Sequence, residues 1–251
     1  MAEGKTRVAI VTGGARGIGR ACAHALAGAG YHIALVDLLV PEMERTAGEI
    51  RASGGQAAIF EADVASFGRA HEIVSEIVQA WRRIDFLLNN AGKSMPKGLL
   101  EITEEEWDRT IDINLKSCFN WCKAVAPIML KQGGGRMVSM SSLNAHTGGV
   151  TSAVSKFAYA AAKAGILGLT RALAKELGPN ISVNAICPGI IETELGNTLT
   201  RSRGSELKKS IALGRLGSPQ DVANLVAFLA TSDPCFITGQ NFIVDGFQWV
   251  M

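Results

Sequence analysis

The sequence lacks both a strong charge imbalance and any long hydrophobic run. In 251 residues, 25 Lys and Arg stand against 23 Asp and Glu, so the formal net charge is only +2. A chain so close to neutral creates no strong field to attract nucleic acid or an anionic membrane surface. The apolar runs are far shorter than the roughly 20 residues that a membrane-spanning helix needs, and no secretion-signal pattern is visible. We therefore expect a soluble, cytoplasmic protein that binds neither nucleic acid nor membrane.

The sequence is also poor in proline, cysteine and histidine. Seven Pro and no long Gly-rich or Pro-rich stretch exclude collagen-like, low-complexity and linker-joined architectures. Five Cys without a C-x-x-C pair favour free thiols in a reducing compartment. Cys118 and Cys122 could share a helix face that binds a metal, although burial as small apolar side chains is the favoured interpretation. The four His are scattered, so we expect no metal site.

What the sequence does contain is an alternation of short β-branched runs with longer helix-period segments, which is typical of repeated βα units. The apolar runs predict seven strands, at Val8–Val11, Ile33–Val36, Ala57–Phe60, Ile84–Leu88, Arg136–Met140, Ser182–Ile186 and Asn241–Val244. Because these runs show no polar alternation, helices should cover both faces of a mainly parallel sheet. The predicted fold is α/β, a single doubly wound Rossmann-type domain over residues 1–251, with the more polar segment 190–217 as a mobile substrate lid within it.

A glycine-rich loop follows the first predicted strand and leads into a helix. It reads Thr12-Gly13-Gly14-Ala15-Arg16-Gly17-Ile18-Gly19. Glycines let the backbone approach a pyrophosphate, and the free N–H groups at a helix start favour its negative charge. The spacing departs from the G-x-G-x-x-G dinucleotide motif, so tight strand-to-helix packing is the alternative explanation.

Two charged residues near this loop bear on the choice of cofactor. Asp37 ends the second predicted strand, where a carboxylate can accept both ribose hydroxyls of an adenosine and repel a 2′-phosphate. Arg16 lies in the loop, where a cation could pair with that phosphate or serve equally as a solvated or structural cation. Because Asp37 would oppose the phosphate directly, the sequence favours NAD(H) over NADP(H).

A tyrosine and a lysine are four residues apart in the alanine-rich helical segment Tyr159-Ala160-Ala161-Ala162-Lys163. Residues at this spacing share one helix face, so the ammonium can stabilise the phenolate during proton transfer. A packed Tyr beside a solvated Lys would explain the motif equally well if it stood alone.

Together these motifs resemble those of the short-chain dehydrogenase/reductase family in its compact form, and the resemblance spans the whole chain. The matching motifs, in chain order, are T-G-x-x-x-G-x-G at residues 12–19, N-N-A-G at Asn89–Gly92, Ser141-Ser142, Tyr159, Lys163, and Pro188-Gly189 with Thr193. The resemblance implies hydride transfer between a nicotinamide cofactor and a secondary alcohol or ketone, with no metal.

The resemblance also assigns roles to individual residues. Tyr159 would be the general acid/base, Lys163 would bind the nicotinamide ribose and favour the phenolate, and Asn114 would hold a water in a proton relay toward Lys163. Ser142 would hydrogen-bond the substrate oxygen; Ser141 is the alternative, because neighbours in an extended segment face opposite ways. The implied cofactor-binding residues are Gly13, Arg16, Gly17, Ile18, Gly19, Asp37, Asp63, Val64, Asn90, Ala91, Gly92, Tyr159, Lys163, Pro188, Gly189 and Thr193.

The motifs leave the small-molecule substrate open. The loop 143–158 would form one wall of its pocket, with His146 beside Ser142 and Tyr159 in contact with substrate, and segments 93–99 and 190–203 would form the others. Such mixed linings suit a polyol, a sugar, a hydroxy acid or an acyl chain.

We expect NAD(H)-dependent interconversion of a secondary alcohol and a ketone. The alternative is an NADPH-dependent 3-oxoacyl-[acyl-carrier-protein] reductase. Such an enzyme needs a basic surface on which the acidic carrier protein can dock, and the available cations are Lys97, Arg201, Arg203, Lys208 and Lys209. A third possibility, a non-enzymatic NAD-binding sensor or scaffold, is disfavoured by the intact catalytic set. The resemblance further implies a homotetramer that meets through helices around 104–130 and 159–177 and through the C-terminal strand.

Overall fold

The computed structural model describes residues 6–149, 155–194 and 198–248. Within them, seven strands form one sheet in the order β3-β2-β1-β4-β5-β6-β7, and every neighbouring pair is parallel. The strands are β1 (Arg7–Thr12), β2 (Tyr31–Asp37), β3 (Ala57–Glu61), β4 (Phe86–Asn89), β5 (Gly135–Met140), β6 (Ile181–Pro188) and β7 (Asn241–Val244). The prediction of a seven-stranded, mainly parallel sheet is confirmed, and the sheet is in fact wholly parallel.

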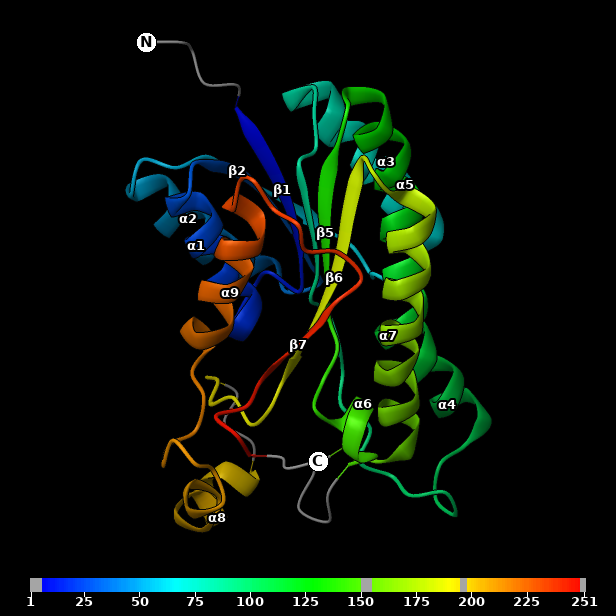
Figure 1. Cartoon of the computed structure of the whole chain (residues 1–251), viewed down its shortest axis with the longest axis vertical. Helices are drawn as coiled ribbons and strands as arrows, with labels where there is room; N and C mark the ends of the chain where they lie inside the picture. Colours follow the sequence, from blue (N-terminus) through cyan, green and yellow to red (C-terminus); the bar gives the residue numbers. More distant parts are fainter. Residues whose placement is uncertain (1–5, 150–154, 195–197, 249–251) are drawn as a thin grey trace.

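Helices cover both faces of this sheet (Figure 1). They are α1 (Gly17–Gly28), α2 (Val40–Ala52), α3 (Phe67–Trp81), α4 (Glu104–Ile111), the π-helical turn η1 (Asp112–Lys116), α5 (Ser117–Gln132), α6 (Asn144–Thr147), α7 (Phe157–Leu177), α8 (Thr198–Lys209) and α9 (Pro219–Thr231). On one face α1, α2 and α9 pack against Ala9 and Val11; on the other, α3, α5 and α7 pack against Val8 and Ile10. Successive strand residues are buried on opposite faces, which explains the continuous apolar runs.

The strand order reverses next to β1, because β2 and β3 lie on one side of it and β4 to β7 on the other. In doubly wound sheets a crevice opens at this point, beyond the carboxyl ends of the strands. The loops after β1, β2, β3 and β4 converge there. Helices α6 and α8 lie at the same end of the molecule (Figure 1).

The segment predicted to be a lid, residues 190–217, contains the helix α8. Leu207, Ile211 and Leu216 form a small apolar cluster against Ile190. An isolated β-bridge joins Ile191 to Gly217. Residues 195–197 and the side chains of 198–203, including the predicted cations Arg201 and Arg203, lie outside the described part of the chain. The role of this segment as a mobile lid stays a prediction.

All five cysteines are free thiols, and four of them are buried. Burial raises the pKa of the Cys122 thiol to about 12, so the thiolate that would bind a metal is disfavoured. Among the described residues, no three His, Cys, Asp or Glu side chains come together as a metal site. No helix in the same part of the chain is long and apolar enough to cross a bilayer.

Candidate functional site

The glycine-rich loop after β1 turns sharply into α1. Gly13 and Gly17 have φ values of +64° and +56°, the left-handed region that glycine adopts without strain. Arg16 occupies the N-cap position of α1, and no side chain caps this helix start. The first-turn N–H groups of α1 are therefore free of capping side chains and can bind an anion.

Asn90, in the N-N-A-G segment after β4, braces this loop. Its Nδ2 donates hydrogen bonds of 3.0 Å to the carbonyl oxygens of Thr12 and Gly13. The backbone N–H groups of Asn90 and Ala91 donate in turn to the Thr12 hydroxyl, at 3.0 and 3.1 Å. A Cβ on Gly13 would lie 2.8 Å from both Ala91 Cα and Asn90 Nδ2. The two predicted cofactor segments are thus locked together at the reversal point of the sheet.

Asp37, at the end of β2, joins the loop to the start of α2. Its Oδ2 accepts a hydrogen bond from Ala15 N at 3.2 Å, and its Oδ1 accepts from Leu38 N and Leu39 N at 2.8 and 3.3 Å. These three N–H groups fix the carboxylate at the mouth of the loop, on the wall of a cavity that Arg16 also lines. The geometry suits the predicted contact with an adenosine ribose.

Asp63, after β3, pairs with a cation that sequence reasoning missed. Arg109 on α4 donates to its Oδ2 at 2.6 Å, and Ala65 N donates to its Oδ1 at 3.0 Å. Desolvation acts to raise the pKa of Asp63, but the hydrogen bond from Ala65 and the Arg109 guanidinium outweigh it and hold the pKa below its usual range. No local pattern marks Arg109, because it approaches from a helix 46 residues away.

A cavity of about 520 Å³ opens between these loops. The predicted cofactor residues that line it are Gly13, Arg16, Gly17, Ile18, Asp37, Asp63, Val64, Asn90, Ala91, Gly92 and Thr193. Lys93 and Glu194, which also line it, belong to the segments predicted to form walls of the substrate pocket. The lining residues that no prediction included are Leu38, Leu39, Ala62, Arg109 and Ile113. A cavity of this size lies within the range that holds small ligands and cofactors.

Five residues predicted to bind the cofactor are not among those that line this cavity: Gly19, Tyr159, Lys163, Pro188 and Gly189. Gly19 lets α1 pack closely against the loop, since a Cβ on Gly19 would lie 2.0 Å from the Gly13 carbonyl oxygen. Pro188 accepts a hydrogen bond from Leu143 N at 2.9 Å, and Gly189 N donates to Val244 at 3.0 Å. These two residues therefore tie the end of β6 to the segment after β5 and to the end of β7.

Tyr159 and Lys163 share a face of α7, as their spacing predicted. Lys163 is only 3% exposed, and its Nζ lies 5.5 Å from the centre of the Tyr159 ring. The Nζ donates to the Met140 carbonyl at 2.7 Å, and a Cβ on Gly92 would lie 3.3 Å from it. Because Gly92 lines the cavity, the buried ammonium lies next to the cavity wall.

Asn114 is fully buried within the π-helical turn η1. Its Nδ2 donates to the carbonyl oxygens of Lys93 and Thr110 at 2.9 and 3.0 Å, and its Oδ1 accepts from Lys93 N at 3.1 Å. A Cβ on Gly92 would lie 2.9 Å from the same Oδ1. Asn114 and Lys163 therefore approach Gly92 from two helices, and single π-turns of this kind often occur at functional sites.

The two candidate serines differ in their partners. Ser141 is buried, and its hydroxyl donates to the Lys163 carbonyl at 2.7 Å. The Ser142 hydroxyl accepts from Asn144 N at 3.2 Å, a bond that leaves its proton available to a substrate oxygen. This arrangement favours Ser142 for the predicted substrate contact. His146, on α6, lies 3.5 Å from Asn241 Nδ2 through its Nε2, and its contact with substrate stays a prediction.

Comparison with known proteins gives consistent matches over nearly the full chain. The model of the family described as Enoyl-(Acyl carrier protein) reductase matches residues 13–246. The 3-oxoacyl-[acyl-carrier-protein] reductase FabG of Staphylococcus epidermidis is 38% identical over 95% of this chain and 97% of its own length. That of Thermotoga maritima is 37% identical over 97% of each chain, and the oxidoreductase UcpA of Salmonella typhimurium is 38% identical over 97% of this chain and 94% of its own.

A solved structure also matches this fold. It is described as a short-chain dehydrogenase/reductase, glucose/ribitol dehydrogenase, from Brucella melitensis. Its TM-score is 0.89 at 31% sequence identity, and the match covers 98% of both chains. The similarity extends over both the sheet and the loops that form the cavity.

Proposed function

The chain belongs to the short-chain dehydrogenase/reductase family of oxidoreductases, and on that premise we propose that it reduces the 3-oxo group of an acyl thioester with a nicotinamide cofactor. Its relatives are enzymes, so the non-enzymatic scaffold is not supported. The motifs alone favour NAD(H)-linked conversion of other alcohols, whereas the names of the relatives favour the 3-oxoacyl alternative.

The observation that carries the reaction is the buried Lys163 ammonium beside the Tyr159 ring, next to the cavity wall. The nicotinamide, when bound, supplies the hydride. Tyr159 donates a proton to the substrate oxygen as the alcohol forms, and the nearby cation stabilises the phenolate that is left. Ser142 holds the substrate oxygen by a hydrogen bond, and Asn114 holds a water that returns a proton toward Lys163.

The substrate class is tested by turnover with the purified chain. We expect it to oxidise NADH or NADPH in the presence of acetoacetyl-coenzyme A, with kcat/KM at least tenfold above that for oxidation of ribitol, glucose or a 2-hydroxy acid. Turnover of the polyols alone would contradict the 3-oxoacyl proposal and establish the second candidate, an NAD-linked alcohol dehydrogenase. That candidate is favoured by Asp37 and by the similarity to the Brucella glucose/ribitol dehydrogenase.

We propose NAD(H) as the preferred cofactor because of the fixed Asp37 carboxylate. A 2′-phosphate carries a charge of roughly −1.5 to −2 at neutral pH, and Asp37 would repel it. The wild-type protein should bind NADH at least tenfold more tightly than NADPH, and Asp37→Asn should remove most of that preference. Fluorescence titration with both dinucleotides measures it.

The matched control for this substitution is Glu61→Gln. Glu61 ends the neighbouring strand β3 in register with Asp37 and is exposed, but it does not line the cavity. Glu61→Gln removes the same charge and should not change the preference for NADH over NADPH. Tighter binding of NADPH than NADH by the wild-type protein would instead assign the 2′-phosphate to Arg16, which lines the same cavity.

An acidic carrier protein would need basic residues near the cavity. Lys97 is held by Glu106 at 2.5 Å, whereas Lys208 and Lys209 are exposed at the end of α8. Of the predicted docking cations whose side chains the structure describes, Lys208 and Lys209 are therefore the ones without an acidic partner that holds them.

We also propose that the chain forms a homotetramer. Exposed apolar side chains on two of the predicted interface elements support it, Phe119 and Leu130 on α5 and Ile243 on β7. The cytoplasmic location stays a prediction.

A further inference from the structure

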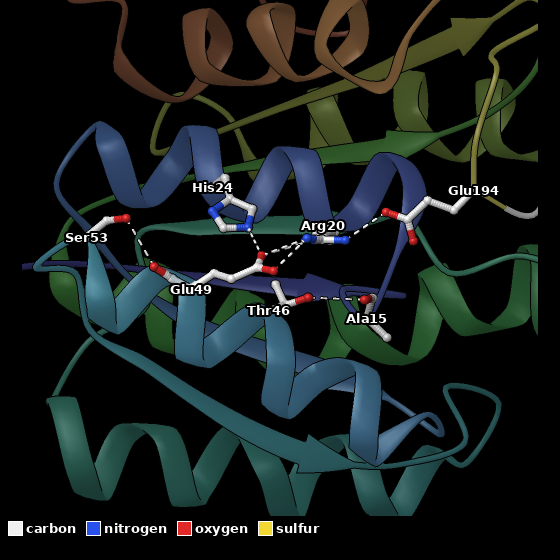
Figure 2. Close-up of polar contacts among 7 residues, drawn as sticks. All are labelled: Ala15, Arg20, His24, Thr46, Glu49, Ser53 and Glu194. Atoms are coloured by element: carbon white, nitrogen blue, oxygen red, sulfur yellow. Dashed lines mark hydrogen bonds and ion pairs between the residues drawn. The ribbon is translucent and has the colours of Figure 1, made fainter.

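A polar network at the edge of the cofactor cavity is not explained by the motifs or by the proposed chemistry. It centres on Arg20, one turn into α1. Figure 2 shows the Arg20 guanidinium between Glu49 of α2 and Glu194 of the segment that follows β6. Arg20 Nη2 and Nε donate to the Glu49 carboxylate at distances from 2.7 to 3.2 Å, and Nη1 donates to Glu194 Oε1 at 2.7 Å. One side chain thus connects three segments that are far apart in the sequence.

Glu49 holds Arg20 in place. The hydrogen bond from Arg20 lowers the pKa of Glu49, so this carboxylate is ionised at neutral pH. His24 Nε2 lies 3.0 Å from Oε2 of the same carboxylate, and the Ser53 hydroxyl donates to the Glu49 carbonyl at 3.1 Å (Figure 2). A bidentate contact fixes the plane of a guanidinium, which leaves Nη1 directed at Glu194.

The contact with Glu194 bears on the cavity because of the residue before it. Thr193 and Glu194 both line the cavity, whereas Arg20 does not. A Cβ on Gly17 would lie 3.4 Å from Thr193 Cγ2, so Thr193 lies over the first turn of α1. A backbone hydrogen bond holds this segment just before Thr193, where Glu192 N donates to the Gly217 carbonyl at 2.7 Å. Beyond that bridge, the Arg20–Glu194 ion pair ties the described part of the segment to α1.

We propose that Arg20 is a positioning residue that holds Glu194, and through it Thr193, across the mouth of the cofactor cavity and so slows release of the dinucleotide. This inference rests on the proposed cofactor site. Glu194 is 59% exposed, and ion pairs this exposed are weak and screened by salt. The contact can therefore open at each turnover, as a group that gates cofactor exchange must.

The test is a stopped-flow measurement of NADH dissociation, or of NADPH dissociation if NADPH binds more tightly. Glu194→Gln removes the ion pair and keeps the size of the side chain. It should raise the dissociation rate about two- to fivefold, the effect of an exposed ion pair. The KM for the dinucleotide should rise while kcat does not fall, and the melting temperature should stay within about 2 °C of the wild-type value because the site is at the surface.

Glu192→Gln is the matched control. Glu192 is an exposed glutamate two residues earlier in the same segment and is not among the residues that line the cavity. Its substitution removes the same charge and should leave the dissociation rate unchanged. Added salt should speed dissociation more in the wild-type protein than in Glu194→Gln, because only the former has the ion pair to screen.

A double-mutant cycle identifies the partner. If Arg20 acts through Glu194, the change Glu194→Gln should have no further effect in an Arg20→Gln background. Equal dissociation rates for Glu194→Gln and Glu192→Gln, in a wild-type background that binds the dinucleotide, would overturn the inference and leave the proposed function intact. Absence of dinucleotide binding by the wild-type protein would overturn the proposed cofactor site, and the inference with it.

Discussion

Replacing Tyr159 with Phe should lower kcat by about 10²- to 10⁴-fold, the usual contribution of a positioned general acid or base. The substitution removes one hydroxyl and keeps the ring that lies 5.5 Å from the Lys163 ammonium. The dinucleotide should still bind within about twofold of the wild-type affinity, because Tyr159 is not among the residues that line the cavity. Steady-state kinetics with acetoacetyl-coenzyme A and fluorescence titration of the dinucleotide measure the two effects separately.

The chain contains one other tyrosine, which makes the control unusually direct. Tyr31 begins β2, at the opposite end of that strand from Asp37, and its buried hydroxyl donates to the Ala230 carbonyl at 2.7 Å. Tyr31→Phe should cost about 1 kcal/mol of unfolding free energy, the value of one hydrogen bond, and should leave kcat nearly unchanged. Turnover that survived in Tyr159→Phe at a rate similar to that of Tyr31→Phe would remove Tyr159 from the proton-transfer step.

The sheet could be predicted from the sequence because its signal is local and redundant. Residues such as Val8 and Ala9 are fully buried on opposite faces, so a central strand such as β1 contains a continuous apolar run that can be recognised without its partners. The doubly wound arrangement followed from the βα alternation, since parallel crossovers leave few topologies. Strand ends were less exact: β6 continues to Pro188, two residues beyond the predicted Ile186.

The contacts at the cavity were harder to predict because they join side chains from distant elements. Arg109 meets Asp63 across 46 residues, and Arg20 meets Glu194 across 174. No periodicity or spacing encodes such pairs, and each arginine alone is indistinguishable from a solvated surface charge. The π-helical turn around Asn114 was also not foreseen, since the sequence from Ile111 onward continues an ordinary helical pattern.

The choice between Ser141 and Ser142 shows where local reasoning stops. An extended segment dictates that the two side chains face opposite ways, but not which one faces the cavity. The structure adds the missing fact, a hydrogen bond from the Ser141 hydroxyl to the Lys163 carbonyl. Helix α7 therefore fixes Ser141 through its backbone while it presents Tyr159 and Lys163 through its side chains.

Gly19→Ala should destabilise the protein by about 3 kcal/mol and abolish tight dinucleotide binding. The added Cβ would lie 2.0 Å from the Gly13 carbonyl oxygen and 2.6 Å from Asn90 Nδ2. Neither neighbour can move freely, because Gly13 N is bonded to the Val36 carbonyl at 2.8 Å and Asn90 is bonded to Thr12 and Gly13. Overpacking of such a site typically costs roughly 1–3 kcal/mol, and a clash with backbone belongs at the upper end.

The same helix offers a matched substitution at Gly28. It lies in the last turn of α1, and a Cβ there would meet nothing within 4 Å. Gly28→Ala should therefore stabilise the protein by about 0.4–1 kcal/mol, because alanine restricts the unfolded chain without strain in the folded one. Both variants add one methyl group to the same helix. The difference between their stabilities therefore measures the effect of the close approach of α1 to the loop.

Thermal unfolding distinguishes the two substitutions. For a chain of this size about 1 kcal/mol corresponds to roughly 2–4 °C, so Gly19→Ala should lower the melting temperature by about 6–12 °C. Gly28→Ala should raise it by about 1–4 °C. If Gly19→Ala unfolded at the wild-type temperature and bound the dinucleotide normally, the loop would have to tolerate a Cβ. The close approach of α1 to Gly13 would then not be what shapes the proposed pyrophosphate site.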